Sequence, residues 1–195
     1  LLLSRVYLYQ KKYDDVITVV DDLLKTTETE IIPYSTLEKF ISSDDVVYKV
    51  YNTNNPGMIF SWGKLDVDAT GFGYDLMRHS KAFFCASSEL IGLYDEGNDL
   101  RFSRYYDKYD FNNYDEGIFY VATKNYCKAS TANEAYDQAL RLEEAYLNRA
   151  EAYIEKGEHE LGMDDVNAIR AERIKGEYEL VANSVDEARE FYRLE

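Results

Sequence analysis

Positive charge is scarce in this chain of 195 residues: 22 lysines and arginines face 37 aspartates and glutamates, giving a formal net charge of -15. Because nucleic-acid affinity comes largely from contacts between cations and phosphates, the composition argues against a nucleic acid as the partner. It disfavours an anionic lipid surface for the same reason. A membrane-spanning helix is not expected either, since no apolar run approaches the roughly 20 residues that one needs.

Histidine and cysteine are also scarce, with two residues of each. His159-Glu160 begins like the zinc-protease helix H-E-x-x-H, but Met163 stands where the second histidine ligand belongs. Cys85 and Cys127 form no CxxC pair, and although one disulfide is allowed, we expect two buried thiols. The sequence therefore predicts neither a metal ion nor a cofactor.

The common nucleotide and hydrolase motifs are incomplete. Leu76 stands where a dinucleotide loop starting at Gly71 needs its third glycine. The segment from Gly57 to Gly63 is one residue too long for a P-loop, and no G-x-S-x-G elbow occurs. A glycosidase needs only two carboxylates across a cleft, so the 37 acidic residues leave a carbohydrate-active hydrolase open as an alternative.

Apolar residues make up 46% of the chain and follow helical spacing in two segments. Residues 1–25 predict a helical hairpin, with Leu2, Val6 and Tyr9 at helical spacing on its first helix. Residues 138–173 predict a second hairpin, whose inward side chains on the second helix are Met163, Val166 and Ile169.

The two predicted hairpins match each other when Lys11 is placed opposite Gly157. Gly157 then ends a helix as a C′ glycine, and Val20 falls opposite Val166. This is the pattern of tetratricopeptide-type helix pairs, which generally stack in threes or more. We therefore expect further helices outside this chain or from its flanking segments.

Residues 26–137 do not repeat, and their long polar and aromatic stretches predict an irregular insertion. Val46–Tyr51, Gly57–Trp62 and Gly117–Ala122 predict short strands, and Ser87–Glu96 predicts a helix capped by Ser87. The predicted fold is mainly α, with tetratricopeptide-like helical hairpins and a loop-rich insertion that contains a few short strands. We predict a single domain fragment, divided into hairpin 1–25, insertion 26–137 with candidate ligand loops, hairpin 138–175 and C-terminal loop and helix 176–195.

Four segments in their order resemble the SusD/RagB family, glycan-binding lipoproteins of the Bacteroidetes outer membrane. They are RVYLYQKKYDDVI (5–17), SSELIGLYDEGNDLRF (87–102, with Asp99-x-Arg101), RLEEAYLNRAEAYIEKG (141–157) and DDVNAIRAER (164–173). The chain departs from the family in having Lys11 where glycine is frequent. It also begins without a lipidated cysteine or signal peptide, since LLLSRVYLYQ indicates an amphipathic helix, and we expect both upstream of residue 1.

The resemblance implies a protein that is not an enzyme and needs no cofactor. Such proteins lie on the outer face of the outer membrane, held by a lipid anchor. They bind oligosaccharide or polysaccharide and pass it to a TonB-dependent, SusC-like transporter for nutrient uptake. The residues alone leave two other classes open, a carbohydrate-active hydrolase and a helical-repeat adaptor that binds a protein. Release of reducing ends would identify the hydrolase.

Sugars have weakly apolar C–H faces and a rim of hydroxyl groups, which suit aromatic rings and polar side chains respectively. Residues 61–78 of the predicted insertion offer both kinds of side chain. We predict Trp62, Phe72 and Tyr74 as stacking residues and Asp66, Asp68 and Arg78 as polar ligand contacts. A place in the core is the alternative for Trp62, because it ends a predicted strand.

The segment Asp66-x-Asp68-x-Thr70-Gly71 is also half of an EF-hand loop. The other half is missing, because position 12 should be a bidentate glutamate and is Met77. A metal-free turn is therefore the favoured interpretation of this segment.

One polar stripe runs along the predicted helix after residue 141. Arg141, Glu144, Asn148 and Glu151 follow spacings of three, four and three and so share a face. We predict a structural role for this stripe, either as a partly buried Arg141–Glu144 ion pair or as a solvated face, in preference to catalysis.

Overall fold

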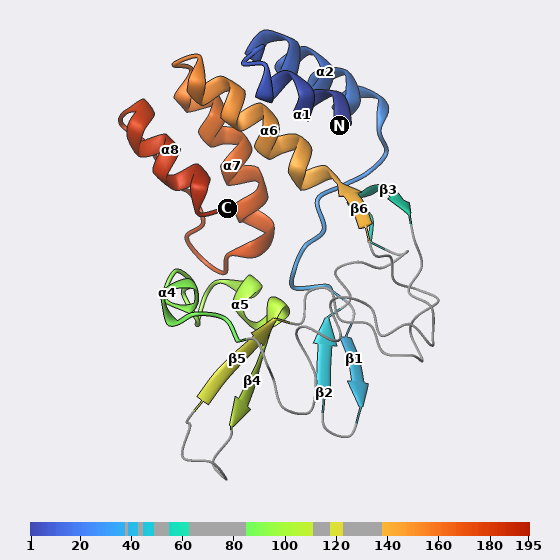
Figure 1. Ribbon diagram of the computed structural model, residues 1–195, viewed down its shortest axis with the longest axis vertical. Coiled ribbons are helices and arrows are strands. Elements are labelled where there is room, and N and C mark those ends of the chain that lie inside the picture. Colours follow the sequence, from blue (N-terminus) through green and yellow to red (C-terminus); the bar gives the residue numbers. More distant parts are fainter. Residues whose placement is uncertain (38, 43–44, 49–54, 63–84, 111–117, 123–137) are drawn as a thin grey trace. The chain divides into compact units, whose positions relative to one another are not determined.

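The computed structural model describes residues 1–37, 39–42, 45–48, 55–62, 85–110, 118–122 and 138–195. These residues are mainly helical and include short antiparallel strand pairs, so the predicted mainly α class is confirmed (Figure 1). The chain divides into two units, each described below by itself. Unit 1 comprises Leu1–Ile31, Pro56–Phe60 and Leu140–Glu195, and unit 2 comprises Ile32–Asn55 and Ser61–Ala139.

Unit 1 is a layered set of helices. Successive helices α1 and α2 form one hairpin, α6 and α7 form another, and α8 packs on both α6 and α7 (Figure 1). Their bounds are α1 Leu2–Tyr9, α2 Tyr13–Thr26, α6 Leu142–Glu155, α7 His159–Arg173 and α8 Val185–Arg193.

The beginning of the second hairpin differs from the prediction. Gln138–Arg141 is strand β6 and not the first turn of a helix. It pairs with β3 (Met58–Trp62), and the N–H of Leu142 donates to the carbonyl of Gly57 at 2.8 Å. Arg141 keeps an extended backbone as the N-cap of α6, so the helix cannot begin earlier.

The turns of the two hairpins have the same geometry. Each has one residue in the left-handed region, Lys11 with φ 56° and Gly157 with φ 87°. Each turn also has the two backbone hydrogen bonds of a Schellman motif, which satisfy carbonyls at the end of the first helix. They are Lys12 N–H to Tyr7 O and Lys11 N–H to Leu8 O, both 2.9 Å, and Glu158 N–H to Tyr153 O at 2.9 Å and Gly157 N–H to Ile154 O at 3.0 Å.

Helix α6 lies between two apolar clusters. On one side Ala145 and Ala152 pack against Val16 and Val20 of α2. On the other side Ala150 and Ile154 pack against Met163, Val166 and Ala188 of α7 and α8. The alanines leave room for close helix packing, and the predicted inward positions Met163, Val166 and Ile169 are all buried.

Gly162 makes the α6–α7 contact especially close. A Cβ atom at this position would lie 2.6 Å from Cγ1 of Ile154 and 2.8 Å from the carbonyl oxygen of Ala150. No larger side chain fits without moving backbone, so this glycine determines how closely the two helices approach.

Arg149 joins three helices of unit 1 through its guanidinium group. It donates to Asp165 of α7 at 2.7 and 2.8 Å and to Asp21 of α2 at 2.5 Å. The hydrogen bonds with Asp165 are the main reason why the pKa of Arg149 is raised. Burial raises the pKa of the Asp165 carboxyl, while Arg149 opposes that shift. The pair therefore acts as a partly buried structural clamp, in which the Asp165 side chain is the buried member.

Unit 2 contains short elements around an aromatic core. Strand β1 (Lys39–Ser42) pairs antiparallel with β2 (Asp45–Tyr48), and β4 (Tyr106–Asp110) pairs with β5 (Ile118–Ala122). The buried core side chains are Ile32, Tyr34, Leu37, Leu100 and Tyr105, the last two from helix α5 (Leu100–Tyr105).

The strand predictions are largely confirmed. The strands predicted at 57–62 and 117–122 correspond to β3 (Met58–Trp62) and β5 (Ile118–Ala122), and the one predicted at 46–51 corresponds to β2, which ends at Tyr48. Residues 49–51 lie outside the described residues. Strands β1 and β4 were not predicted, because KFIS and YDKYD are too short and too polar to stand out.

The helix predicted at 87–96 starts as expected, because Ser87 Oγ accepts a hydrogen bond from Leu90 N–H at 3.2 Å. Helix α4 (Ser88–Ile91) nevertheless ends five residues before the predicted end. Asp95 explains the difference: its carboxylate accepts from the N–H of Gly97 at 3.0 Å and so stabilises a turn in place of further helix.

Candidate functional site

Of the six predicted ligand residues, only Trp62 lies within the described part of the chain. Trp62 is the last residue of β3, as predicted, but nothing is described of its side chain. Phe72, Tyr74, Asp66, Asp68 and Arg78, and with them the half EF-hand segment, lie outside the described residues. The predicted glycan contacts therefore stay predictions.

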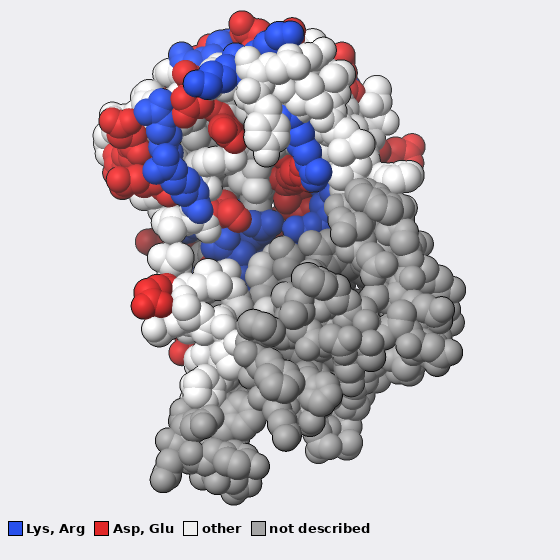
Figure 2. Space-filling view, viewed as in Figure 1, with Lys and Arg blue, Asp and Glu red and all other residues white. Residues whose placement is uncertain are grey.

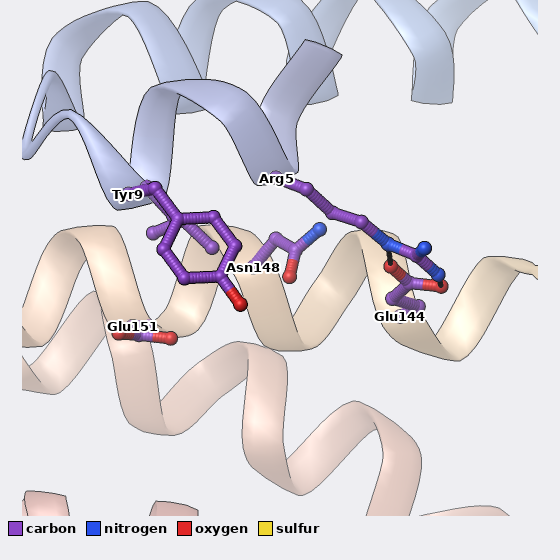
Figure 3. A pocket seen from close by; sticks show the side chains of 6 residues that line it. Arg5, Tyr9, Glu144, Asn148 and Glu151 are labelled. Carbon is purple, nitrogen blue, oxygen red and sulfur yellow. Dashed lines mark hydrogen bonds and ion pairs between the residues drawn. The ribbon is translucent and has the colours of Figure 1, made fainter. Parts of the chain in front are cut away.

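A pocket of about 470 Å³ lies in unit 1 between α1 and α6. Its walls are formed by three residues of each helix, and Figure 3 shows their side chains facing one another across the space. A volume in this range suits a small ligand or one unit of a longer chain. The lining residues, which we call the α1–α6 groove, are Arg5, Leu8, Tyr9, Glu144, Asn148 and Glu151.

Polar side chains fix one end of the groove. Arg5 forms a bidentate ion pair with Glu144, in which Nη2 and Oε2 are 2.6 Å apart. The hydrogen bond to Glu144 is the main cause of the raised pKa of Arg5. Because the two charges compensate each other, this end of the groove has no net charge.

The centre and the other end of the groove keep open hydrogen-bonding groups. Asn148 donates from Nδ2 to Ser4 Oγ at 2.8 Å, which leaves its carbonyl oxygen as an acceptor. Glu151 accepts from Tyr192 Oη through Oε2 at 2.8 Å, and its Oε1 has no partner in the described part of the chain. Tyr9 is 93% exposed and its ring lies beside Asn148 and Glu151 in Figure 3.

The polar stripe predicted on α6 is present, with one difference in pairing. Glu144, Asn148 and Glu151 share the face that lines the groove, as their spacing predicts. Arg141 pairs with the buried Glu143 at 3.3 Å, and the partner of Glu144 is Arg5. The predicted Arg141–Glu144 pair is thus wrong, because Arg141 precedes the helix in an extended conformation and not in helical register.

The α1 residues of the groove were missed by sequence reasoning. Tyr9 shares helical spacing with the apolar Leu2 and Val6, a pattern typical of a core face, yet all three are exposed. Helix α1 instead packs on its neighbours through Ser4, which is buried, and Leu8. Because serine is not apolar, a buried serine does not contribute to the hydrophobic pattern, and the sequence could not predict which face of α1 is buried.

The arrangement of the groove suits binding better than catalysis. Glu144 and Glu151 are the only two carboxylates among its lining residues. A glycosidase needs two carboxyl groups that act together on one bond. Here one of the two is neutralised by Arg5, and the groove offers no serine or cysteine as a nucleophile.

The two charged residues of the Asp99-x-Arg101 motif bind each other. Asp99 caps α5 by accepting from Arg101 N–H at 2.9 Å, and its carboxylate accepts from the guanidinium group at 2.7 to 3.1 Å. Both side chains are buried, and the guanidinium group lies over the ring of Tyr94 at 5.5 Å. The motif has a structural role in unit 2.

Charges elsewhere on unit 1 are intermingled. Figure 2 shows Lys and Arg side chains next to Asp and Glu over this unit. Many of them are ion pairs, for example Arg189 with Glu155 and Lys156 with Asp14. The described residues contain no group of three or more His, Cys, Asp or Glu side chains able to hold a metal ion.

Cys85 corrects a further expectation. Its side chain is exposed and not buried, because it lies in the open chain just before α4. Cys127 lies outside the described residues. No helix of the described chain has the length and apolar character needed to cross a membrane.

The chain matches no protein-family model, and no curated protein is significantly similar to it. Its function is therefore inferred from the sequence resemblance and from the geometry described above.

Proposed function

We propose that the protein is a non-catalytic glycan-binding protein of the SusD/RagB type. In this proposal it is anchored to the outer membrane through a lipid on an upstream cysteine. It captures oligosaccharide at the cell surface and delivers it to a TonB-dependent transporter. The observation that carries the proposal is the ordered set of four sequence segments that resemble this family.

The packing of unit 1 supports a tetratricopeptide-like scaffold. In the register that places Lys11 opposite Gly157, the two hairpins have the same turn hydrogen bonds. Buried positions also coincide, since Ser4 falls opposite Ala150 and Val20 opposite Val166, and all four are at most 1% exposed. Related surroundings at equivalent positions are expected when two helix pairs are units of one array.

The motif residues support a role that is not catalytic. Arg149 and Asp165 belong to two of the resembling segments and are used in the three-helix clamp. Asp99 and Arg101 belong to a third segment and are used to cap and fix α5. Residues that satisfy one another in this way build a scaffold, and we propose that the loop-rich insertion presents the ligand contacts on it.

Oligosaccharide binding by the purified chain tests this proposal. Isothermal titration with neutral oligosaccharides should give saturable binding, and a reducing-sugar assay on the same mixtures should detect no cleavage. Cleavage would identify a hydrolase, and absence of binding to every sugar tested would remove the glycan function.

A second candidate, a protein-binding helical-repeat adaptor, is favoured by one observation. In the register above, Leu3 and Val6 of α1 fall opposite Arg149 and Ala152, the α6 residues that contact α2. Leu3 and Val6 themselves are half exposed. A complex with a protein that is lost in a Leu3→Glu/Val6→Glu variant, in a chain that binds no sugar, would favour the adaptor.

A further inference from the structure

We infer that the α1–α6 groove of unit 1 is a contact site for a neutral sugar, with Tyr9 as the stacking ring and Glu151 and Asn148 as hydroxyl acceptors. This site is distinct from the loop residues predicted between 61 and 78. The inference rests on the proposed glycan function, because the class of ligand comes from it. The position and the preference for a neutral sugar come from the geometry of the groove.

The shape of the groove provides the first argument. Its volume of about 470 Å³ is lined by side chains of two helices, which hold them more rigidly than loops do. Leu8 contributes an apolar wall, and the ring of Tyr9 stands at the rim with most of its surface exposed. An exposed ring next to a pocket can cover the weakly apolar face of a sugar.

The unused hydrogen-bonding atoms provide the second argument. Asn148 Oδ1 and Glu151 Oε1 are acceptors on successive turns of α6, and the other atoms of these groups are held by Ser4 and Tyr192. The held atoms fix the orientation of the open ones, so little side-chain entropy is lost on binding. Acceptors fixed in a row suit a ligand that brings hydroxyl donors.

The charge of the groove selects among glycans. Arg5 is neutralised by Glu144, which leaves the carboxylate of Glu151 as the only uncompensated charge among the lining residues. A sulfated or carboxylated sugar would place a second negative charge beside it, in a chain with a formal net charge of -15. We therefore expect a neutral oligosaccharide to bind and its sulfated counterpart to bind poorly.

The test uses the full 195-residue chain and a panel of neutral oligosaccharides of glucose, mannose, galactose and xylose, with sulfated counterparts. Affinity for the best neutral sugar is measured by titration for the wild type, Tyr9→Ala and Glu151→Gln. Glutamine keeps the hydrogen bond from Tyr192 while removing the charge. We expect each variant to lower affinity roughly 3- to 10-fold, the range of an aromatic contact or of one typical net hydrogen bond.

Two control variants test whether the loss of any exposed tyrosine or any negative charge lowers the affinity for sugar. Tyr178 is a partly exposed tyrosine outside the groove, and Tyr178→Ala keeps its backbone hydrogen bond with Arg170. Glu190→Gln changes the same charge on the exposed face of α8. Both control variants should bind like the wild type, and thermal unfolding of all four variants confirms that they are folded.

The outcomes distinguish the two proposals. Wild-type binding that is unchanged in Tyr9→Ala and Glu151→Gln would overturn the groove and leave the glycan function intact. Failure to bind any member of the panel would overturn both. Tighter binding of a sulfated sugar through these residues would contradict the inferred preference for neutral glycans.

Discussion

The two helical hairpins of unit 1 share a turn but differ in their surroundings. The turns after α1 and α6 have the same pair of hydrogen bonds and one left-handed residue each. Helix α6, however, is covered on two sides by α2 and by α7 with α8, whereas α1 exposes Leu2, Leu3, Val6 and Tyr9. The comparison shows that turn chemistry can determine the form of a hairpin while side chains determine where it packs.

The clamp at Arg149 gives the largest expected difference between the hairpins. Leu3 and Val19 occupy the equivalent positions of the first hairpin when Lys11 matches Gly157. Arg149→Leu leaves the buried Asp165 without its partner, and we expect the free energy of unfolding to fall by about 3–5 kcal/mol in chemical denaturation. The double variant Arg149→Leu/Asp165→Val copies the first hairpin and should recover much of the loss. No recovery would show that the loss is not due to an unpaired charge.

The close contact at Gly162 is the next difference. Its counterpart in the first hairpin is the buried Val16. Gly162→Val would place methyl groups against Ile154 and the backbone of Ala150, so we expect a loss of about 1–3 kcal/mol in unfolding free energy. Gly157 and Gly176 are poor control positions because both have a positive φ. Gly97→Ala is the better control, because a Cβ atom there would lie no closer than 3.5 Å to its nearest neighbour, Asp95 Oδ1. An unchanged stability in Gly162→Val would mean that α7 moves freely.

The residues with positive φ in the two turns can be exchanged for each other, lysine for glycine and glycine for lysine. Lys11 adopts φ 56° and Gly157 φ 87°, a region in which a side chain is unfavourable. We expect Gly157→Lys to lower the unfolding free energy by about 1 kcal/mol and Lys11→Gly to raise it by less, since glycine also gains entropy in the unfolded chain. Thermal unfolding of both variants checks the opposite signs. A gain in stability for Gly157→Lys would contradict this explanation of the turn.

Acidification should affect the stability of the two hairpins differently, and this is the smallest of the four expected effects. The pKa of Glu155 is lowered from 4.5, chiefly by its hydrogen bond with Arg189 of α8, and its counterpart in the first hairpin is Tyr9. Its stabilising contribution is complete above pH 4.5 and is lost as pH falls through the lowered pKa of the folded state. Amide exchange should therefore speed up in α8 below pH 4.5, and Glu155→Gln should remove this dependence.

Helix positions in unit 1 could be predicted because periodic apolar side chains and one glycine carry strong local signals. The orientation of α1 could not, because its buried face includes Ser4 and its exposed face carries Leu2, Leu3 and Val6. The α1–α6 groove was missed for the same reason, since it depends on two helices that are 139 residues apart at the Arg5–Glu144 pair. Local sequence also cannot show that Arg141 forms its ion pair with Glu143 and not with Glu144.

The pairing of β3 with β6 has a consequence for how such a chain can diversify. The two strands bring residues near 62 and 138 together, so the long segment between them begins and ends at one place. The entropy of closing a loop grows only with the logarithm of its length, and doubling the length adds about 0.6 kcal/mol. Extending that segment should therefore change the stability of the unit 1 helices little, so unit 1 can carry different recognition surfaces.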